Sequence, residues 1–370
     1  MNTVITNDNR PCMKNAAGAL LLGLTLLVSC TKEPAAELLP GEPETVRLTP
    51  SAWIVAGAQV QSRAAVDGDH FPAGNTRHSI GMWVCKHEAE PAKFEPAMPG
   101  YGNLLASLIV EAAGENERRD LWKFTPAGTN GTSYDILNVR RNQTVDVYAY
   151  YPHTTIATDP TAIPFTTGDS DWMWAEPVPN KVNSGGESSI DVPLRFHHAM
   201  TCLRVRINCK YEGNVTLTSM TLTDHKATSD EDSRLYKEGT MNILNSGELT
   251  LFGRTQNLTV TYNSALEQDP KRIKDFYIIM PPVENYENEQ FGLSFKFNGM
   301  DAQTSFKIPN TMMKKDPDNP DAPGETVTIT AFEVGKRYTY SLTLDNTMKF
   351  EPIDIEDVWN SDGNDIEIEL

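Results

Sequence analysis

The chain has few cysteines for its length, five in 370 residues. Cys12 and Cys30 lie before or at the end of an N-terminal apolar run, which leaves Cys85, Cys202 and Cys209. An odd number of cysteines argues against a disulfide framework. Because Cys202 and Cys209 are seven residues apart in a strand-like segment, they face opposite sides and cannot pair within it. We expect all three to be buried as small apolar side chains.

Basic clusters and catalytic motifs are also missing. Lys and Arg number 32 against 50 Asp and Glu, which gives a net charge of −18. Without a basic patch, the chain has no electrostatic surface for nucleic acid. It contains no Gly-x-Ser-x-Gly, no His-Glu-x-x-His and no phosphate-binding glycine loop. We therefore expect no enzymatic activity, no cofactor and no nucleic-acid partner.

Two short motifs are similar to metal sites but have simpler explanations. His197 and His198 are adjacent in a strand-like segment, so their imidazoles point to opposite faces. Asp316, Asp318 and Asp321 have the spacing of a calcium loop, but two prolines and a missing terminal Glu break the EF-hand pattern. We expect packing or hydrogen bonding for the histidines, a solvated turn for the aspartates, and no metal site.

Long apolar runs are absent apart from Ala16–Ser29, which is shorter than the span of about 20 residues that a bilayer needs. Lys14 precedes the run, and Leu27-Val28-Ser29-Cys30 ends it with the residue order of a bacterial lipobox. This plan is typical of a signal peptide. We predict that residues 1–29 are removed by a cut between Ser29 and Cys30, and that Cys30 carries a lipid anchor. The alternative is a plain secretory signal in which Cys30 has no role.

The rest of the chain is dominated by β signals. Residues 30–45 are rich in Pro, Glu and Ala, which predicts a flexible tether. After them, short segments alternate apolar and polar residues between clusters of Gly, Pro, Asn and Asp, as strands do. Only Leu104–Ala113 is a candidate helix. The strand candidates are Ser79–Cys85, Thr144–Tyr151, Cys202–Ile207, Val215–Leu222, Leu249–Leu251, Asn257–Tyr262, Phe276–Met280, Phe291–Phe297, Val327–Ile329 and Tyr338–Leu344.

These segments predict an all-β fold with two β-sandwich-like domains of mainly antiparallel strands. The composition changes at Pro177–Gly186, from a Trp-, Tyr- and Pro-rich half to a long, regular series of strands. We place the domain boundary near residue 187. The N-terminal domain then covers residues 46–186 and the C-terminal domain covers residues 187–370.

The start of the N-terminal domain has a feature of its own. Val46–Gln61 is strand-prone around Ala52–Val60, and Ser62–Asp69 after it is small and polar enough to form an exposed loop. Exposed loops are preferred sites of proteolysis. A strand that precedes a cleavable loop could be removed from the fold. The alternative is an ordinary first strand with an ordinary turn.

The C-terminal segment Lys349–Leu370 contains two alternating stretches, the second of them DIEIEL. A strand with such a pattern has one face suited to burial. It either donates a strand to another chain or completes its own domain. The candidate donor residues are Phe350, Ile353, Ile355, Val358, Ile366, Ile368 and Leu370.

Two tryptophans are the candidates for ligand binding. Trp172 and Trp174 in DSDWMW are two residues apart, so on a strand they share a face. Aromatic rings placed in this way could stack on sugars. The alternative, which we favour, is packing in the core or at a strand edge.

Several segments together resemble the fimbrillin-like family of Bacteroidales, the subunits of type V pili. The first are the lipobox at Cys30 and the strand-like segment that ends in Arg63-Ala64. Three more have the residue pattern of family motifs, in the family's order. They are VDVYAYYP at Val145–Pro152, VPLRFHHAMTCLRVRI at Val192–Ile207, and FEVGKRYTYSLTL at Phe332–Leu344 followed by Ile353–Trp359.

The resemblance implies a two-domain lipoprotein of the outer membrane that is assembled into a fimbrium at the cell surface. It implies a protease cut between Arg63 and Ala64 that releases Val46–Arg63, with Arg47 and Arg77 as alternative cuts. A strand of another copy, or of a related pilus subunit, would fill the open groove head to tail. Adhesin members would also bind surface ligands of a host or of other bacteria. The alternative function is a non-polymerising, carbohydrate-binding surface lipoprotein.

Overall fold

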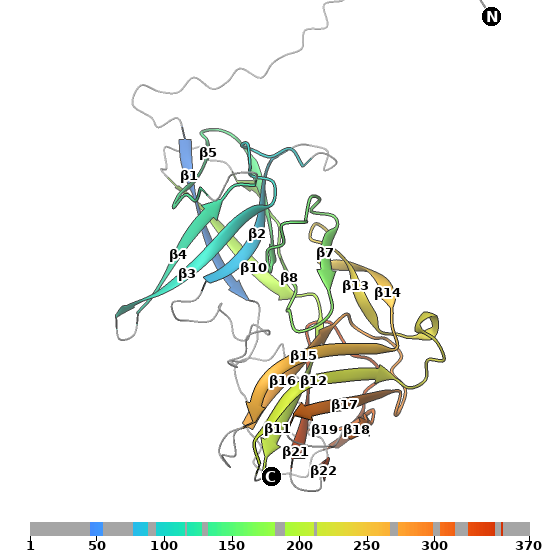
Figure 1. Cartoon of the computed structure of the whole chain (residues 1–370). Coiled ribbons are helices and arrows are strands. Elements are labelled where there is room, and N and C mark those ends of the chain that lie inside the picture. The colour runs from blue at the N-terminus through green and yellow to red at the C-terminus, as the bar shows by residue number, and fades with distance from the viewer. Residues whose placement is uncertain are drawn as a thin grey trace, which may run out of the picture. The chain divides into compact units, whose positions relative to one another are not determined.

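The computed structural model describes residues 45–54, 77–87, 94–114, 117–127, 132–181, 189–210, 213–266, 273–298, 304–314, 325–344 and 349–350 (Figure 1). These residues form β-strands in five sheets and one short 3-10 helix, η1 (Asp230–Asp232). The fold is all-β, as predicted. Within the described ranges, no helix is long and apolar enough to cross a membrane.

The largest sheet has nine strands, in the order β4-β3-β2-β6-β8-β10-β1-β5, with β9 paired to β6 beside this path. Neighbouring strands are antiparallel except β1 and β10, which run parallel. The strands are β1 (Thr45–Ile54), β2 (Arg77–Lys86), β3 (Leu104–Gly114), β4 (Glu117–Thr125), β5 (Leu137–Arg140), β6 (Val145–Tyr151), β8 (Met173–Ala175), β9 (Val178–Lys181) and β10 (Ser189–His198).

The other four sheets have the orders β16-β11-β21-β22, β15-β12-β17-β18, β14-β13-β7 and β19-β20. Only β11 and β21 are parallel among these described pairs. The strands are β7 (Ile163–Thr166), β11 (Thr201–Cys209), β12 (Val215–Asp224), β13 (Tyr236–Asn242), β14 (Glu248–Arg254), β15 (Asn257–Leu266), β16 (Ile273–Met280), β17 (Phe291–Asn298), β18 (Thr304–Lys307), β19 (Thr311–Lys314), β20 (Glu325–Thr328), β21 (Arg337–Leu344) and β22 (Lys349–Phe350).

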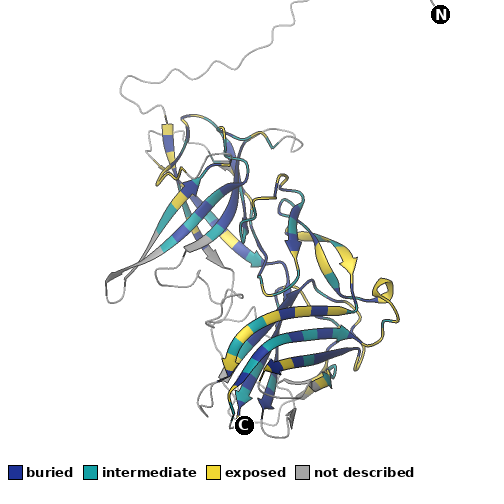
Figure 2. Cartoon of the chain, viewed as in Figure 1, coloured by how far each residue is buried: buried dark blue, intermediate teal, exposed yellow. Residues whose placement is uncertain are grey.

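The alternation of apolar and polar residues determines which segments form these strands. In β10, the sequence SIDVPLRFHH buries every second residue from Ile190 to His198, and the same banding is visible along many strands in Figure 2. Each of the ten predicted strand segments overlaps a strand of the structure. The candidate helix at 104–113 was wrong, because this segment forms β3. Its buried residues Leu104, Ala106 and Leu108 are two apart, and both edges of β3 pair with strands.

Among the residues that the structure describes, the buried side chains form three apolar clusters. One is built from β11, β12, β15, β16, β17 and β21, and a second from the nine-stranded sheet. The third is rich in aromatic residues and includes Trp83, Tyr150, Phe165, Trp172 and Tyr277. Large apolar side chains in such clusters supply most of the driving force for folding.

The predicted boundary near residue 187 and the sandwich-like arrangement of each domain remain predictions. β10 follows that boundary in the sequence, and it hydrogen-bonds to β1 and β8 of the nine-stranded sheet. The segment from β11 onward supplies the strands of the two four-stranded sheets.

Candidate functional site

The first strand is the structural element on which the predicted assembly depends. β1 lies between two neighbours, parallel to β10 and antiparallel to β5 (Figure 1). Its pairing with β10 runs from Arg47 to Ile54, and its pairing with β5 covers Thr45 to Leu48. β1 therefore has a backbone partner along its whole length, and at Arg47 and Leu48 it has partners on both sides.

The side chains of β1 alternate between the core and the surface. Val46 and Leu48 are each 1% exposed, and Ala52 is 9% exposed. Across the ladders, Leu48 lies opposite Leu137 and Ile190. Every second position of β5 and β10 that pairs with β1 is a buried apolar residue: Leu137, Val139, Ile190, Val192, Leu194 and Phe196. Burying one aliphatic side chain of this size contributes about 1.5–3 kcal/mol. The buried side chains of β1 therefore help to hold this strand in the sheet.

A polar contact fixes the register of β1 on β10. The Thr49 hydroxyl lies 3.0 Å from the Ile190 carbonyl oxygen and 2.7 Å from Asp191 Oδ1. A slip of one residue would turn every buried side chain of β1 toward solvent. Pro50, which has no backbone N–H to donate, lies beyond the stretch that β5 covers.

At the other end of the chain, β22 pairs with the outer edge of β21. The paired positions are Phe350 opposite Leu342 and Lys349 opposite Thr343. The start of the candidate donor segment thus adds to a sheet of its own chain. The remaining donor candidates lie outside the described residues: Ile353, Ile355, Val358, Ile366, Ile368 and Leu370.

The predicted processing sites also lie outside the described residues. This holds for the signal cut at Ser29 and Cys30, for the lipid-bearing Cys30, and for the maturation cut between Arg63 and Ala64. These roles remain predictions. The structure does describe the end of β1 at Ile54, which precedes Arg63 in the chain.

The two tryptophans proposed to stack on sugars both pack against the aromatic-rich cluster. Trp172 is 7% exposed, its indole Nε1 donates to the Thr166 carbonyl at 3.3 Å, and its ring lies against Phe165. Trp174 is partly buried and stacks on His197 with ring centroids 4.8 Å apart. The buried Trp172 ring offers no open face to a sugar, and the Trp174 ring is stacked on His197, so this geometry favours the packing role.

The adjacent histidines bond to different carboxylates. His197 Nε2 lies 2.9 Å from Glu176 Oε1, and both side chains are partly exposed. His198 Nδ1 lies 2.9 Å from Asp171 Oδ2, and both of these side chains are at most 1% exposed. Each imidazole thus has a hydrogen-bonded carboxylate. Across the described ranges, no group of three or more His, Cys, Asp or Glu could hold a metal ion.

The three remaining cysteines are free and buried, as predicted. Cys202 and Cys209 belong to two different apolar clusters, in agreement with their opposite faces on β11. Burial raises the pKa of Cys85 to about 12, and the charge of Asp146 adds to the shift. The Cys85 thiol therefore stays protonated near neutral pH, which is unsuited to nucleophilic chemistry.

The sequence reasoning missed the most important partner of β1. The alternation of apolar and polar residues from Val46 to Ala52 indicates a strand, but Pro50 interrupts it. The sequence therefore predicts a strand centred on Ala52–Val60, further along the chain than β1. Nothing in the local pattern of Ile190 to Phe196 indicates a parallel partner more than 130 residues earlier in the chain, since a pairing of that kind is set by the whole fold.

Comparison with solved structures found several similar proteins. Among solved structures, a candidate cell adhesion protein of Bacteroides uniformis has 18% identity and a TM-score of 0.44, covering 85% of this chain and 99% of its own. A second from Bacteroides fragilis has 9% identity and a TM-score of 0.49, with coverages of 87% and 99%. A fimbrial assembly protein of Parabacteroides distasonis has 8% identity and a TM-score of 0.35, with coverages of 84% and 98%.

No curated protein matches the sequence. The family model described as "Fimbrillin-like" matches residues 111–357, which is well over half of the sequence. The chain therefore belongs to the fimbrillin-like family.

Proposed function

We propose that this protein is a fimbrial subunit that joins to further subunits by exchange of its first strand. Its family is one of fimbrial and adhesion proteins and not of enzymes. The observation that carries the proposal is the position of β1 between β10 and β5, with a row of buried apolar side chains on its inner face.

Removal of β1 would leave an acceptor groove. A cut after Arg63 would detach every residue before it, including β1 and the lipid on Cys30. β10 and β5 would then each expose a backbone edge with unpaired N–H and C=O groups, and such an edge invites pairing with another chain. The pockets lined by Leu137, Ile190 and Leu194 would be open to water, which costs further free energy.

A strand from a second subunit would refill this groove by β-augmentation, in which backbone hydrogen bonds bind the strand and alternate side chains fill the pockets. The C-terminal segment suits this role because its last apolar residues, Ile366, Ile368 and Leu370, have the same spacing of two as Val46 and Leu48. Phe350, Ile353, Ile355 and Val358 form one candidate set. Ile366, Ile368 and Leu370 form the other. Donation from one subunit to the next is a heterologous contact, which generates filaments.

In this scheme the uncut protein is an inactive precursor. While β1 is covalently attached, its high effective concentration keeps the groove filled and excludes a donor from another subunit. We propose that the precursor is exported as a two-domain lipoprotein of the outer membrane, anchored by Cys30. Cleavage at the cell surface then releases the anchor and permits assembly into a fimbrium.

Limited digestion of the purified protein with an arginine-specific protease tests this scheme. We expect a new N-terminus at Ala64, followed by SDS-resistant ladders on a gel. Two variants serve as controls: Arg63→Ala should resist the cut, and a chain that ends at Asn346 should be cut but form no ladder by itself.

The outcomes separate the parts of the proposal. A folded protein that is not cut at Arg63 would contradict the activation step. A cut at Arg63 without ladders would contradict self-polymerisation and leave a tip or anchor role. Ladders from the chain that ends at Asn346 would show that another segment is the donor.

A further inference from the structure

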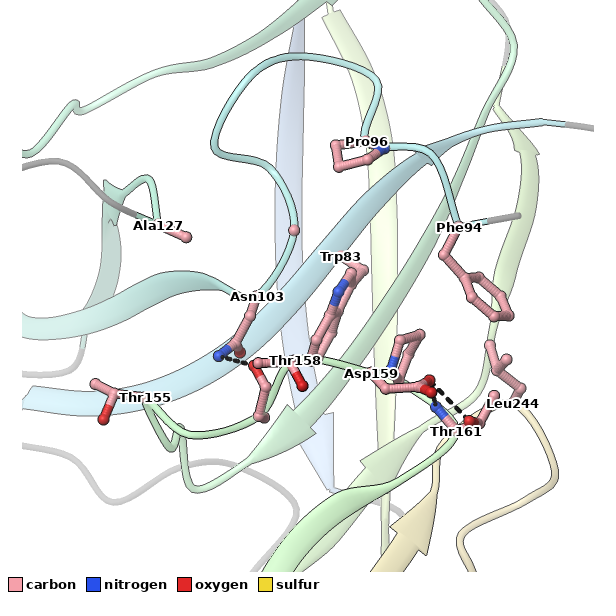
Figure 3. A pocket seen from close by; sticks show the side chains of 13 residues that line it. Trp83, Phe94, Pro96, Asn103, Ala127, Thr155, Thr158, Asp159, Thr161 and Leu244 are labelled. Atoms are coloured by element: carbon pink, nitrogen blue, oxygen red, sulfur yellow. Dashed lines mark hydrogen bonds between the residues drawn. The ribbon is translucent and has the colours of Figure 1, made fainter. Parts of the chain in front are cut away.

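A cavity of about 910 Å³ opens beside β2 (Figure 3). Its walls come from Trp83 on β2, from Phe94 and Pro96 after that strand, and from the segment Thr155–Thr161 between β6 and β7. None of its described lining residues belongs to β1, β5 or β10. We propose that this cavity, the Trp83 pocket, binds a neutral sugar residue of a glycan.

Trp83 supplies the donor of the pocket. Its side chain is 3% exposed and is held against Tyr150, with ring centroids 5.6 Å apart. The indole Nε1 makes no hydrogen bond to any described residue. This nitrogen lies 3.7 Å from the point that a Cβ on the lining residue Gly102 would occupy. Because a buried indole N–H usually has an acceptor, this N–H suits an oxygen atom of a bound ligand.

Another wall of the pocket is held in place by Asn103, which is buried with a left-handed φ of 51°. Its Nδ2 donates to the carbonyl oxygens of Thr154 at 2.9 Å and Ala157 at 2.8 Å. Its Oδ1 accepts a hydrogen bond from the Tyr150 hydroxyl at 2.8 Å. The same Tyr150 ring supports Trp83, so one residue fixes two sides of the pocket. A wall fixed in this way is preorganised, which lowers the entropic cost of binding.

The chemistry of the lining selects the class of ligand. Asp159 Oδ1 accepts from the backbone N and the hydroxyl of Thr161, at 2.8 and 2.7 Å, while Asp159 Oδ2 has no partner among the described residues. Phe94, Pro96 and Leu244 add apolar surface. No Lys, Arg or His stands among the described lining residues, so the pocket is unsuited to an anion.

A neutral sugar matches this set of groups. Its hydroxyl oxygens accept from the indole N–H of Trp83, its hydroxyl protons donate to the free oxygen of Asp159, and its C–H faces pack on Phe94 and Pro96. Pockets of this kind, mostly apolar with a few convergent polar groups, are the usual form of small-ligand sites. Neither Trp172 nor Trp174 is among the described residues that line the Trp83 pocket, so this site is distinct from that tryptophan pair.

Saturation-transfer NMR and titration of the uncleaved protein with D-glucose, D-galactose, D-mannose and N-acetyl-D-glucosamine test the proposal. We expect at least one of the four to bind. Trp83→Phe keeps the ring packing but removes the N–H, and should raise the Kd at least fivefold. Gly102→Ala places a methyl group at van der Waals distance from Trp83 Nε1 and should also weaken binding. Trp122→Phe, at a tryptophan that does not line the pocket, should leave the Kd within twofold.

Three results would overturn the proposal. One is that none of the four sugars binds. Another is that Gly102→Ala and Asp159→Asn, both folded by circular dichroism, bind the sugar as tightly as the unchanged protein. The third is that sialic acid, an anionic sugar titrated in parallel, binds more tightly than all four neutral sugars. Because the experiment uses uncleaved protein, its outcome is independent of strand exchange.

Discussion

Leu48 of the first strand lies opposite Leu137 of β5, and neither side chain is more than 1% exposed. The strand that we propose to be expelled on maturation is therefore part of the core of its own sheet. This contact holds β1 in its sheet. Under our proposal, the same pocket would take up a strand of another subunit in the cleaved form.

Replacement of Leu48 tests how far β1 stabilises the precursor. Leu48→Ala should lower the free energy of unfolding by about 2–5 kcal/mol, because it removes buried methyl groups and leaves a cavity. Denaturant unfolding measures this loss. The neighbouring Arg47 is exposed, so Arg47→Ala should change stability by only about 0.5 kcal/mol. Equal effects of the two substitutions would mean that β1 is not packed as described.

The hydroxyl of Thr49 offers a finer test of register. Thr49→Val keeps the branched shape but removes the hydrogen bonds to the Ile190 carbonyl and to Asp191. We expect a loss of about 1 kcal/mol in the free energy of unfolding. Asp191→Asn retains an oxygen acceptor and should cost less. A neutral Thr49→Val would show that this contact does not hold β1 on β10.

Much of the fold could be predicted from the sequence, because alternating patterns such as that of β10 report directly on strands with one buried face. The segment at 104–113 was misread, since its alanines and leucines suit a helix and only pairing with β2 and β4 decides for a strand. The Trp83 pocket could not be predicted from the sequence for a similar reason. Trp83, Asn103 and Asp159 come from separate segments, and only the folded chain brings them together.

The two adjacent histidines allow the loss of a buried carboxylate partner to be compared with the loss of an exposed one. Asp171→Ala removes the carboxylate that bonds to His198 Nδ1 in a pair that is at most 1% exposed, and loss of one partner from a buried hydrogen bond costs about 1–3 kcal/mol. Glu176→Ala removes the partner of His197, where the side chains are 29% and 43% exposed, and should cost less than about 1 kcal/mol. Thermal unfolding of both variants would contradict the account if their order were reversed.

Buried tyrosines predict a loss of stability in alkali. Burial raises the pKa of Tyr148, Tyr150 and Tyr151 to about 12 each, whereas an unfolded tyrosine titrates at about 10. Between these values the native state holds protons that the unfolded state has lost. The tyrosine contribution is thus fully present below pH 10 and is lost as the pH rises toward 12.

Unfolding free energies measured at pH 9, 10, 11 and 12 would check this slope. Tyr151→Phe removes one of the titrating groups and should make the slope shallower. A stability that stays constant between pH 10 and 12 would contradict the burial of these phenols.

The most direct measurement of the central proposal is hydrogen exchange of Ser189–His198 and Leu137–Arg140 in three states: the precursor, the protein cut after Arg63, and the assembled ladder. We predict slow exchange in the precursor, fast exchange after the cut under conditions that prevent assembly, and slow exchange again in the ladder. Continued slow exchange of both segments after loss of residues 1–63, with no second subunit bound, would show that no acceptor groove opens and would contradict strand exchange.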